Sequence, residues 1–378
     1  MTAPARNLRA TRAARLLLLL PGGLCMLAGL DAALLLLGLG APLRDASLAD
    51  SHGVLMILGF VGAVVALERA VALGPMRGNT AWGYLAPAGL GLGGVALLTP
   101  LPRDIGATAM LIGTVVLLAV YVPLWRRNMA GAVLVQIAGG ILAVGGALLW
   151  LAGIDMPTLL PWLVCFLVLT IAGERLELAR VAFLDPRAEP AAILIAAAVV
   201  VGVVATALWP VIGYPLLGLA LLTLVGWLLL FDVATKTVRG AGLPRFSAVC
   251  LLAGYSWLSV TAAIWLIAGP VHSGPLYDAS THAVLLGFVI SMIMAHAPII
   301  FPAVLRHPLP YTPLMYLPVA LLHASLLLRV LVGDARGVVG AVQWGGALNI
   351  AALLLFFVIA TGSALRPRRR DPKVGATE

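Results

Sequence analysis

Six histidines are the residues best suited to chemistry, and two of them, His52 and His282, are expected at the same depth in a membrane. His52 opens one long apolar run, and His282 lies about one helical turn into another. A neutral imidazole is costly in hydrocarbon unless both nitrogens are paired, and a metal is a strong partner for the acceptor nitrogen. Two imidazoles from facing helices can bind a haem iron from its two sides. The pair therefore predicts a haem near the outer membrane face, although hydrogen bonding at a helix end would also explain either histidine.

The surroundings of both histidines fit a flat macrocycle with acidic side groups. Haem propionates need cations, and Arg44 and Arg329 end segments that border the same face. Small residues could admit the macrocycle, and they are Gly53, Gly59, Ala283 and Gly287. We therefore expect His52, His282, Arg44 and Arg329 to bind the cofactor.

A second metal position is predicted deeper in the membrane. His296 lies 14 residues after His282, roughly 21 Å along a helix, so these two cannot bind one metal atom. His323, in the next apolar run, lies within reach of His296. The two predict a second haem or a copper site, for which Met292 and Met294 are soft ligands if they are not simply packing residues.

Acidic residues inside apolar runs give a second set of candidates. Glu68 and Arg69 end one run, and the segment 174–177 (ERLE) ends another. Adjacent opposite charges can pair and anchor a helix end, or they can form a proton entry. Asp31 is an isolated carboxylate about 12 Å below the outer end of the first run, which makes it a candidate for a proton relay.

Other common chemistries are not supported. The three cysteines, Cys25, Cys165 and Cys250, are far apart in apolar stretches, so we interpret them as packing residues. The sequence has no GxxxxGK[ST], HExxH or GxSxG motif, and no dinucleotide fingerprint follows a strand. Soluble hydrolase and nucleotide chemistry are therefore not supported.

The elements that position these residues are membrane helices. Of the 378 residues, 62% are hydrophobic and 10% are charged, and the mean hydropathy is +1.08, a composition that excludes a water-soluble globular protein. The net charge of +9 comes from basic residues at the edges of apolar runs, so no basic face for nucleic acid exists. A bilayer core needs about 20 apolar residues per helix. Twelve such runs occur: 15–39, 52–73, 81–98, 105–124, 130–152, 157–179, 190–209, 213–231, 246–268, 279–302, 311–331 and 338–363.

Charge asymmetry predicts how these helices are oriented. Arginines precede the first run, which lacks a convincing cleavage site, so a retained first helix is expected. With a cytoplasmic amino terminus and twelve spans, the Lys and Arg residues expected outside are only Arg44, Arg103, Arg329 and Arg336. We therefore predict a multi-pass protein of the bacterial inner membrane with both termini in the cytoplasm.

Residues 1–365 form a single predicted transmembrane domain, and 366–378 form a basic cytoplasmic tail that would bind anionic lipid. A glycine or cysteine followed by phenylalanine recurs in the second, sixth and tenth runs, nine residues before Glu68, Glu174 and His296. This spacing favours a pseudo-threefold arrangement of four-helix units, although apolar sequences also match by chance. The possible repeats are 1–128, 129–240 and 241–365.

Two segments resemble the NnrS family of haem- and copper-containing bacterial membrane proteins. The resemblance is carried by the LGF tripeptide that follows both His52 and His282, and by LPYTPLMYLPVALLHASLLLR around His323. It covers 51–73 and 278–329. It implies b-type haem, copper and a role in the response to nitric oxide and nitrosative stress.

The arrangement of the histidines is also similar, more distantly, to the core subunit of haem-copper oxidases and nitric oxide reductases. In that family, histidines on the second and tenth of twelve helices hold a low-spin haem, which would map onto His52 and His282. The family's His-His pair for copper is absent from this chain. Oxygen reduction by the oxidase mechanism is therefore not expected.

Three functions compete at this point. The leading prediction is an all-α polytopic membrane haem protein of NnrS type, which handles nitric oxide or transfers electrons to a redox partner. The alternative is an ion-coupled secondary transporter that uses Asp31, Glu68 and Glu174. The third is a non-catalytic assembly or sensor protein. Whether the protein is an enzyme stays open.

Overall fold

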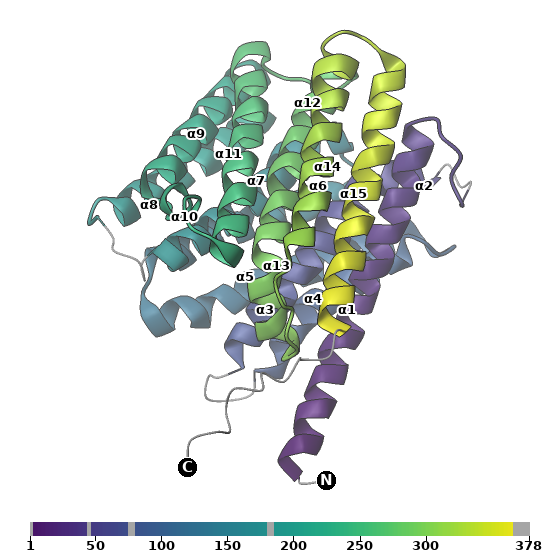
Figure 1. Cartoon of the computed structure of the whole chain (residues 1–378). Coiled ribbons are helices and arrows are strands. Elements are labelled where there is room, and N and C mark those ends of the chain that lie inside the picture. The colour runs from purple at the N-terminus through teal and green to yellow at the C-terminus, as the bar shows by residue number, and fades with distance from the viewer. Residues whose placement is uncertain (1–2, 44–46, 75–79, 180–184, 366–378) are drawn as a thin grey trace.

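The described part of the chain folds as a bundle of long helices (Figure 1). The structure is a computed structural model, and it describes residues 3–43, 47–74, 80–179 and 185–365. Within these ranges every regular element is a helix, so the predicted all-α fold is confirmed. The elements are α1 (Ala3–Leu36), α2 (Ser47–Val54), η1 (Leu55–Gly62), α3 (Ala63–Leu73), η2 (Ala81–Tyr84), α4 (Leu85–Ala96), α5 (Arg103–Asn128), α6 (Gly131–Leu151), α7 (Met156–Ala179), α8 (Ala188–Leu208), α9 (Pro210–Phe231), α10 (Ala234–Thr237), α11 (Gly242–Ala268), α12 (Gly274–His282), η3 (Ala283–Ile290), α13 (Ser291–Leu305), η4 (Pro313–Met315), α14 (Tyr316–Leu327), η5 (Leu328–Asp334) and α15 (Val339–Leu365).

Eleven helical segments of the described chain are long and apolar enough to cross a membrane. The remaining predicted run, 81–98, also folds as a helix, but it is shorter because it consists of the 3₁₀ turn η2 followed by α4. It packs against α1, α3 and α5, so it belongs to the same bundle. The protein is therefore a multi-pass membrane protein, and all twelve predicted runs are helical.

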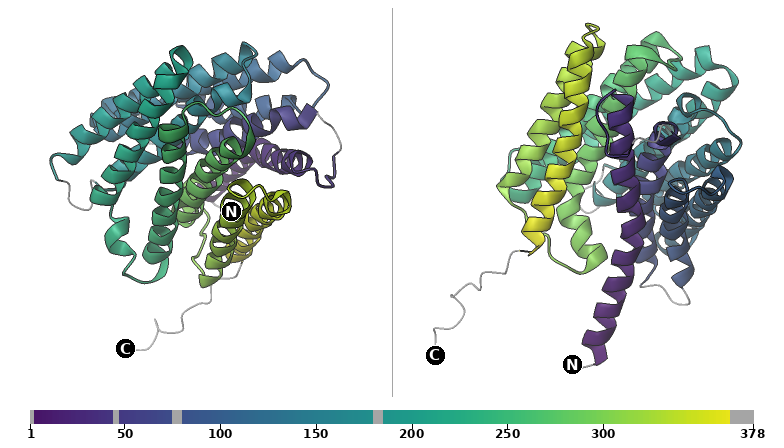
Figure 2. Two further views of the ribbon diagram at one scale, coloured as in Figure 1. Left: turned by 90° about the horizontal axis from the view of Figure 1, so that it is seen from above. Right: turned by 90° about the vertical axis from the view of Figure 1, so that its right-hand side faces the viewer.

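Both ends of the described chain lie at the same end of the bundle, which we call the terminal face (Figures 1 and 2). α1 rises from this face, and α15 returns to it alongside α1. The opposite face carries the connection between η5 and α15. The basic tail predicted at 366–378 lies outside the described residues.

Three spans contain π-helical segments, which the sequence did not predict. η1 follows α2 and its His52, η3 begins directly after His282, and η5 contains Arg329. A π-helical turn adds a residue to the helical repeat and is frequent at functional sites. Each π-helical segment therefore lies beside one of the residues expected to bind the cofactor.

The core lies where the spans that carry the possible repeat meet. α7 contacts both η1 and η3, and α3 contacts α13. The most enclosed of these spans is Met156–Leu178. Large apolar side chains on the outside of the bundle, such as Leu194, Leu230 and Ile267, are exposed and fit a lipid environment. The threefold repeat itself stays a prediction.

Candidate functional site

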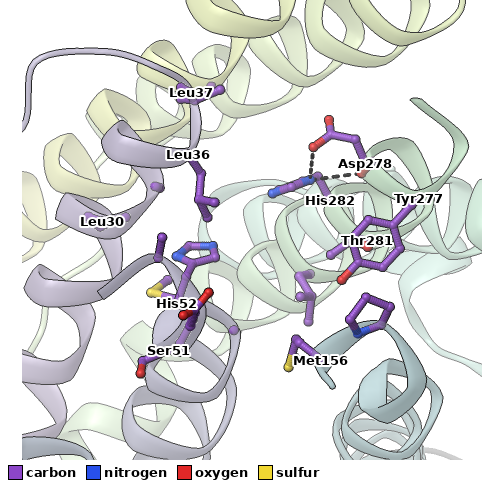
Figure 3. Close-up of a pocket in the computed structure, with 18 of the residues that line it drawn as sticks. Leu30, Leu36, Leu37, Ser51, His52, Met156, Tyr277, Asp278, Thr281 and His282 are labelled. Carbon is purple, nitrogen blue, oxygen red and sulfur yellow. Dashed lines mark hydrogen bonds and ion pairs between the residues drawn. The ribbon is translucent and has the colours of Figure 1, made fainter. Parts of the chain in front are cut away.

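A cavity of about 1040 Å³ lies toward the opposite face of the bundle, and both His52 and His282 line it (Figure 3). Its walls come from α1, α2, η1, the connection from α4 to the start of α5, the end of α6, the start of α7, α12, η3, η5 and α15. Most of the wall is apolar, as in ligand-binding pockets generally. Two histidines that are 230 residues apart in the sequence therefore face one space.

His52 is held by the backbone of α1. Its Nδ1 lies 2.8 Å from the carbonyl oxygen of Gly29, so Nδ1 carries the proton and donates it. α1 approaches closely here, because a β carbon on Gly29 would lie 2.6 Å from Met56 Sδ. In this tautomer Nε2 keeps its lone pair, which is the state that a metal ligand requires.

His282 is held in the same way by its own helix. Its Nδ1 lies 2.9 Å from the carbonyl oxygen of Asp278 and 3.2 Å from the Asp278 carboxylate oxygen Oδ1. A carboxylate behind an imidazole fixes the ring and increases the basicity of the other nitrogen. The Asp278 carboxylate in turn accepts two hydrogen bonds of 2.7 Å from Arg329. Sequence reasoning missed Asp278, although its position four residues before His282 places both on one helix face.

Arginines also reach this cavity. Arg329 lines it, as expected, and is buried. Arg44 lies outside the described residues. Arg103 lines the cavity as well, and its guanidinium carbon lies 3.9 Å from the centre of the Trp150 ring. It was one of the four arginines expected on this face, which is the signal that would have identified it.

Unpaired polar atoms mark the cavity wall. Within the described part of the chain, Trp150 Nε1 and Asn349 Oδ1 are buried without a hydrogen-bond partner, and both residues line the cavity. A buried unpaired donor or acceptor is costly, so such groups require a ligand or water. Together with two free imidazole nitrogens and two arginines, the residues present fit a haem.

The glycines near the two histidines do not line the cavity in the way that we expected. Gly59 and Gly287 do not line the cavity. A β carbon on Gly59 would lie 2.9 Å from Cys25 Sγ, and one on Gly287 would overlap the Trp257 ring. Gly53 lines the cavity, but a β carbon there would lie 2.5 Å from Met156 Cε. These glycines allow neighbouring side chains to pack closely rather than admitting a macrocycle.

His296 is part of a separate buried network. Its Nδ1 lies 2.8 Å from the Met292 carbonyl oxygen, and its Nε2 accepts a hydrogen bond of 3.1 Å from Arg175. Arg175 also donates to both carboxylate oxygens of Asp232, at 2.6 and 2.8 Å, and the Tyr255 hydroxyl donates to the same carboxylate at 2.7 Å. Burial alone would raise the pKa of Asp232, but its hydrogen bonds with Arg175 and Tyr255 hold that pKa below its usual value.

His323 is likewise satisfied by protein groups. Its Nδ1 accepts a hydrogen bond of 3.0 Å from Trp257, and its Nε2 lies 3.4 Å from the Ser291 hydroxyl. In the part of the chain that the structure describes, no group of three or more His, Cys, Asp or Glu side chains is placed to hold a metal ion. A metal at His296 and His323 would have to displace these contacts, so the structure offers no support for the predicted second site.

Comparison with known proteins identifies the family to which the chain belongs. No curated protein and no solved structure matches the chain. One family model matches residues 15–365, which include nearly all of the described bundle. The chain therefore belongs to the family described as Domain of unknown function (DUF8744).

Proposed function

We propose that this protein is a membrane haem protein of NnrS type that binds b-type haem between His52 and His282 and transfers electrons during the bacterial handling of nitric oxide or nitrosative stress. One observation carries the proposal. Two histidines from distant parts of the chain line one cavity, and each donates from Nδ1 to a carbonyl, so that Nε2 is free. This is the arrangement that an axial haem ligand requires.

The chemistry follows from the two ligands. His52 and His282 would hold the haem, which would supply one-electron transfer. Asp278 would orient His282, and Arg329 and Arg103 would offer positive charge to the propionates. The cavity volume of about 1040 Å³ lies at the upper end of the usual range for ligand pockets.

The orientation in the membrane is also part of the proposal. The positive-inside bias of the sequence supports a terminal face on the cytoplasmic side of a bacterial inner membrane. The haem cavity would then lie near the periplasmic side. A redox partner would exchange electrons with the haem from that side. Copper is not part of the proposal, because both ring nitrogens of His296 and of His323 already have partners.

The test is the visible spectrum of the protein purified after haem-replete expression, with a pyridine haemochrome assay and metal analysis on the same sample. We expect a Soret band that is lost or shifted in His52→Ala and in His282→Ala. His307→Ala is the matched control, because His307 is a half-buried loop residue that does not line the cavity, and its loss is expected to leave the band unchanged. A protein without a Soret band, or a band that both cavity variants leave unaltered, would remove the proposal.

Ion-coupled secondary transport is the second candidate, and one observation favours it. Glu68 and Glu174 both contact Arg69 inside the membrane-spanning part of the bundle. Purified protein in liposomes would then move protons or sodium together with a substrate, and the flux would be lost in Glu174→Gln. Liposomes that contain folded protein but show no such flux with any substrate tested would argue against it.

A further inference from the structure

A charged cluster joins α3 to the end of α7, and α3 lies in the half of the bundle nearest the terminal face (Figure 1). At its centre is Arg69 of α3. Its Nη2 lies 2.5 Å from Glu68 Oε1 and 3.4 Å from Glu174 Oε1, and its Nη1 lies 3.7 Å from Glu177 Oε2. None of these residues lines the cavity. The cluster is therefore a second polar region with its own chemistry.

The charges in this cluster do not balance. Three carboxylates face one guanidinium, and the neighbouring Arg175 is already bound to Asp232 and His296. Glu68 and Glu174 contact the same guanidinium nitrogen, so the two carboxyl groups lie close together. Two carboxylates that share a buried site cannot both ionise cheaply, and such pairs hold one proton between them.

The three carboxylate side chains of this cluster differ in how much of their surface is exposed. The Glu177 side chain is 54% exposed, that of Glu68 is 20% exposed and that of Glu174 is 12% exposed. Beyond them, Gln136 of α6 and Tyr121 of α5 are fully buried. The exposed carboxylate of Glu177 is thus linked, through Arg69, to the fully buried amide of Gln136.

Unpaired donors supply the second observation. Among the described residues, Arg69 Nε, Gln136 Nε2 and the Tyr121 hydroxyl are buried without a hydrogen-bond partner. The Gln136 amide points into the cluster, because its Oε1 accepts a hydrogen bond of 3.4 Å from Arg69. Tyr121 lies beside Thr170 and within the electrostatic influence of Arg69, Glu68 and Glu174. Buried donors beside carboxylates are usually satisfied by ordered water, which bridges both.

We propose that this cluster is a proton-exchange site, in which water bound by Arg69, Gln136 and Tyr121 connects a proton shared by Glu68 and Glu174 to the aqueous phase at Glu177. On uptake, a protonated water gives its proton to a carboxylate oxygen, so one O–H bond breaks on water and one forms on the carboxyl group. Release is the reverse, and no electrons are transferred. The site does not depend on haem binding.

The titratable and charged groups that face this proton come from three helices. They are Glu68 and Arg69 on α3, Glu174, Arg175 and Glu177 on α7, and Tyr121 on α5. Only Glu177 is substantially exposed. Proton exchange with the terminal face is therefore expected to pass Glu177 first.

Infrared spectroscopy of the purified full-length protein tests this proposal, because a protonated carboxyl group has a C=O band that shifts in D₂O. Wild-type protein at neutral pH is expected to show such a band, and Glu174→Gln and Glu68→Gln are each expected to abolish it. Asp185→Asn is the control, because Asp185 is an exposed carboxylate in the described chain just before α8 and its loss leaves the band in place. A band retained in both glutamate variants, or no protonated carboxyl in folded wild-type protein, would overturn the proposal.

A second measurement tests the water connection and does not depend on whether the glutamate variants fold. Tyr121→Phe keeps the packing and removes only the buried hydroxyl. It is expected to slow deuteration of the shared carboxyl by about a hundredfold, the lower end of the contribution of positioned proton-transfer groups. An unchanged exchange rate would refute the bound-water path. Because the readout is a carboxyl band, it distinguishes failure of this site from failure of the proposed haem.

Discussion

Removing the Asp232 carboxylate is expected to destabilise the protein strongly. Its side chain is 1% exposed and that of Arg175 is 6% exposed, and two hydrogen bonds of 2.6 and 2.8 Å join them. Asp232→Ala would leave the Arg175 guanidinium buried without its carboxylate, and it would also remove the acceptor of the Tyr255 hydroxyl. Breaking a buried pair by removing one partner costs about 3–5 kcal/mol.

The size of this effect depends on desolvation rather than on the attraction between the two charges. A double variant, Asp232→Leu with Arg175→Met, replaces both charges with apolar groups, and such replacements of buried pairs are often neutral. The double variant is therefore expected to be more stable than Asp232→Ala by about 2 kcal/mol or more, even though it carries one more substitution. The remaining cost comes from Tyr255 and His296, which lose their partners.

The measurement is the free energy of unfolding in mixed micelles, obtained from the loss of helical circular dichroism as the mole fraction of a denaturing detergent rises. Wild-type protein and both variants are compared under one set of conditions. The reasoning would be refuted if Asp232→Ala lost less than about 1 kcal/mol, or if the double variant were as unstable as the single one.

Two further predictions use the same unfolding measurement. In α9, a β carbon on Gly213 would overlap the Ala205 carbonyl carbon, whereas a β carbon on Gly226 would have nothing within 4 Å. Gly213→Ala should therefore lower the free energy of unfolding by about 1–3 kcal/mol, while Gly226→Ala should leave it unchanged or raise it by up to about 1 kcal/mol. Equal effects of the two substitutions would contradict this packing. Because the pKa of Asp232 is lowered in the folded state, its pair with Arg175 stabilises the protein above the ordinary carboxyl pKa of about 3.9, and that stability is lost as the pH falls through the folded value. The stability advantage of wild type over Asp232→Asn should therefore stay constant near neutral pH and shrink below about pH 4; an advantage that grew on acidification would show that the sign is wrong.

The all-α membrane fold follows from composition and run length alone. Continuous apolar runs of about 20 residues have the length of a membrane-spanning helix, in which the backbone groups pair within the same segment. The depth of a residue in the membrane also follows from the sequence, because each residue adds a fixed rise along a helix. The sequence alone therefore puts His52 and His282 at one level, and both histidines line one cavity.

Only the tertiary structure decided which groups each side chain meets. The rotation of a helix about its axis and the identity of its neighbours depend on packing between distant segments. Neither can be predicted from the hydropathy of the sequence. This is why Asp278 and Arg103 emerged as cavity residues only in three dimensions. It is also why the contact between His296 and Arg175 could not be predicted from the depth of His296.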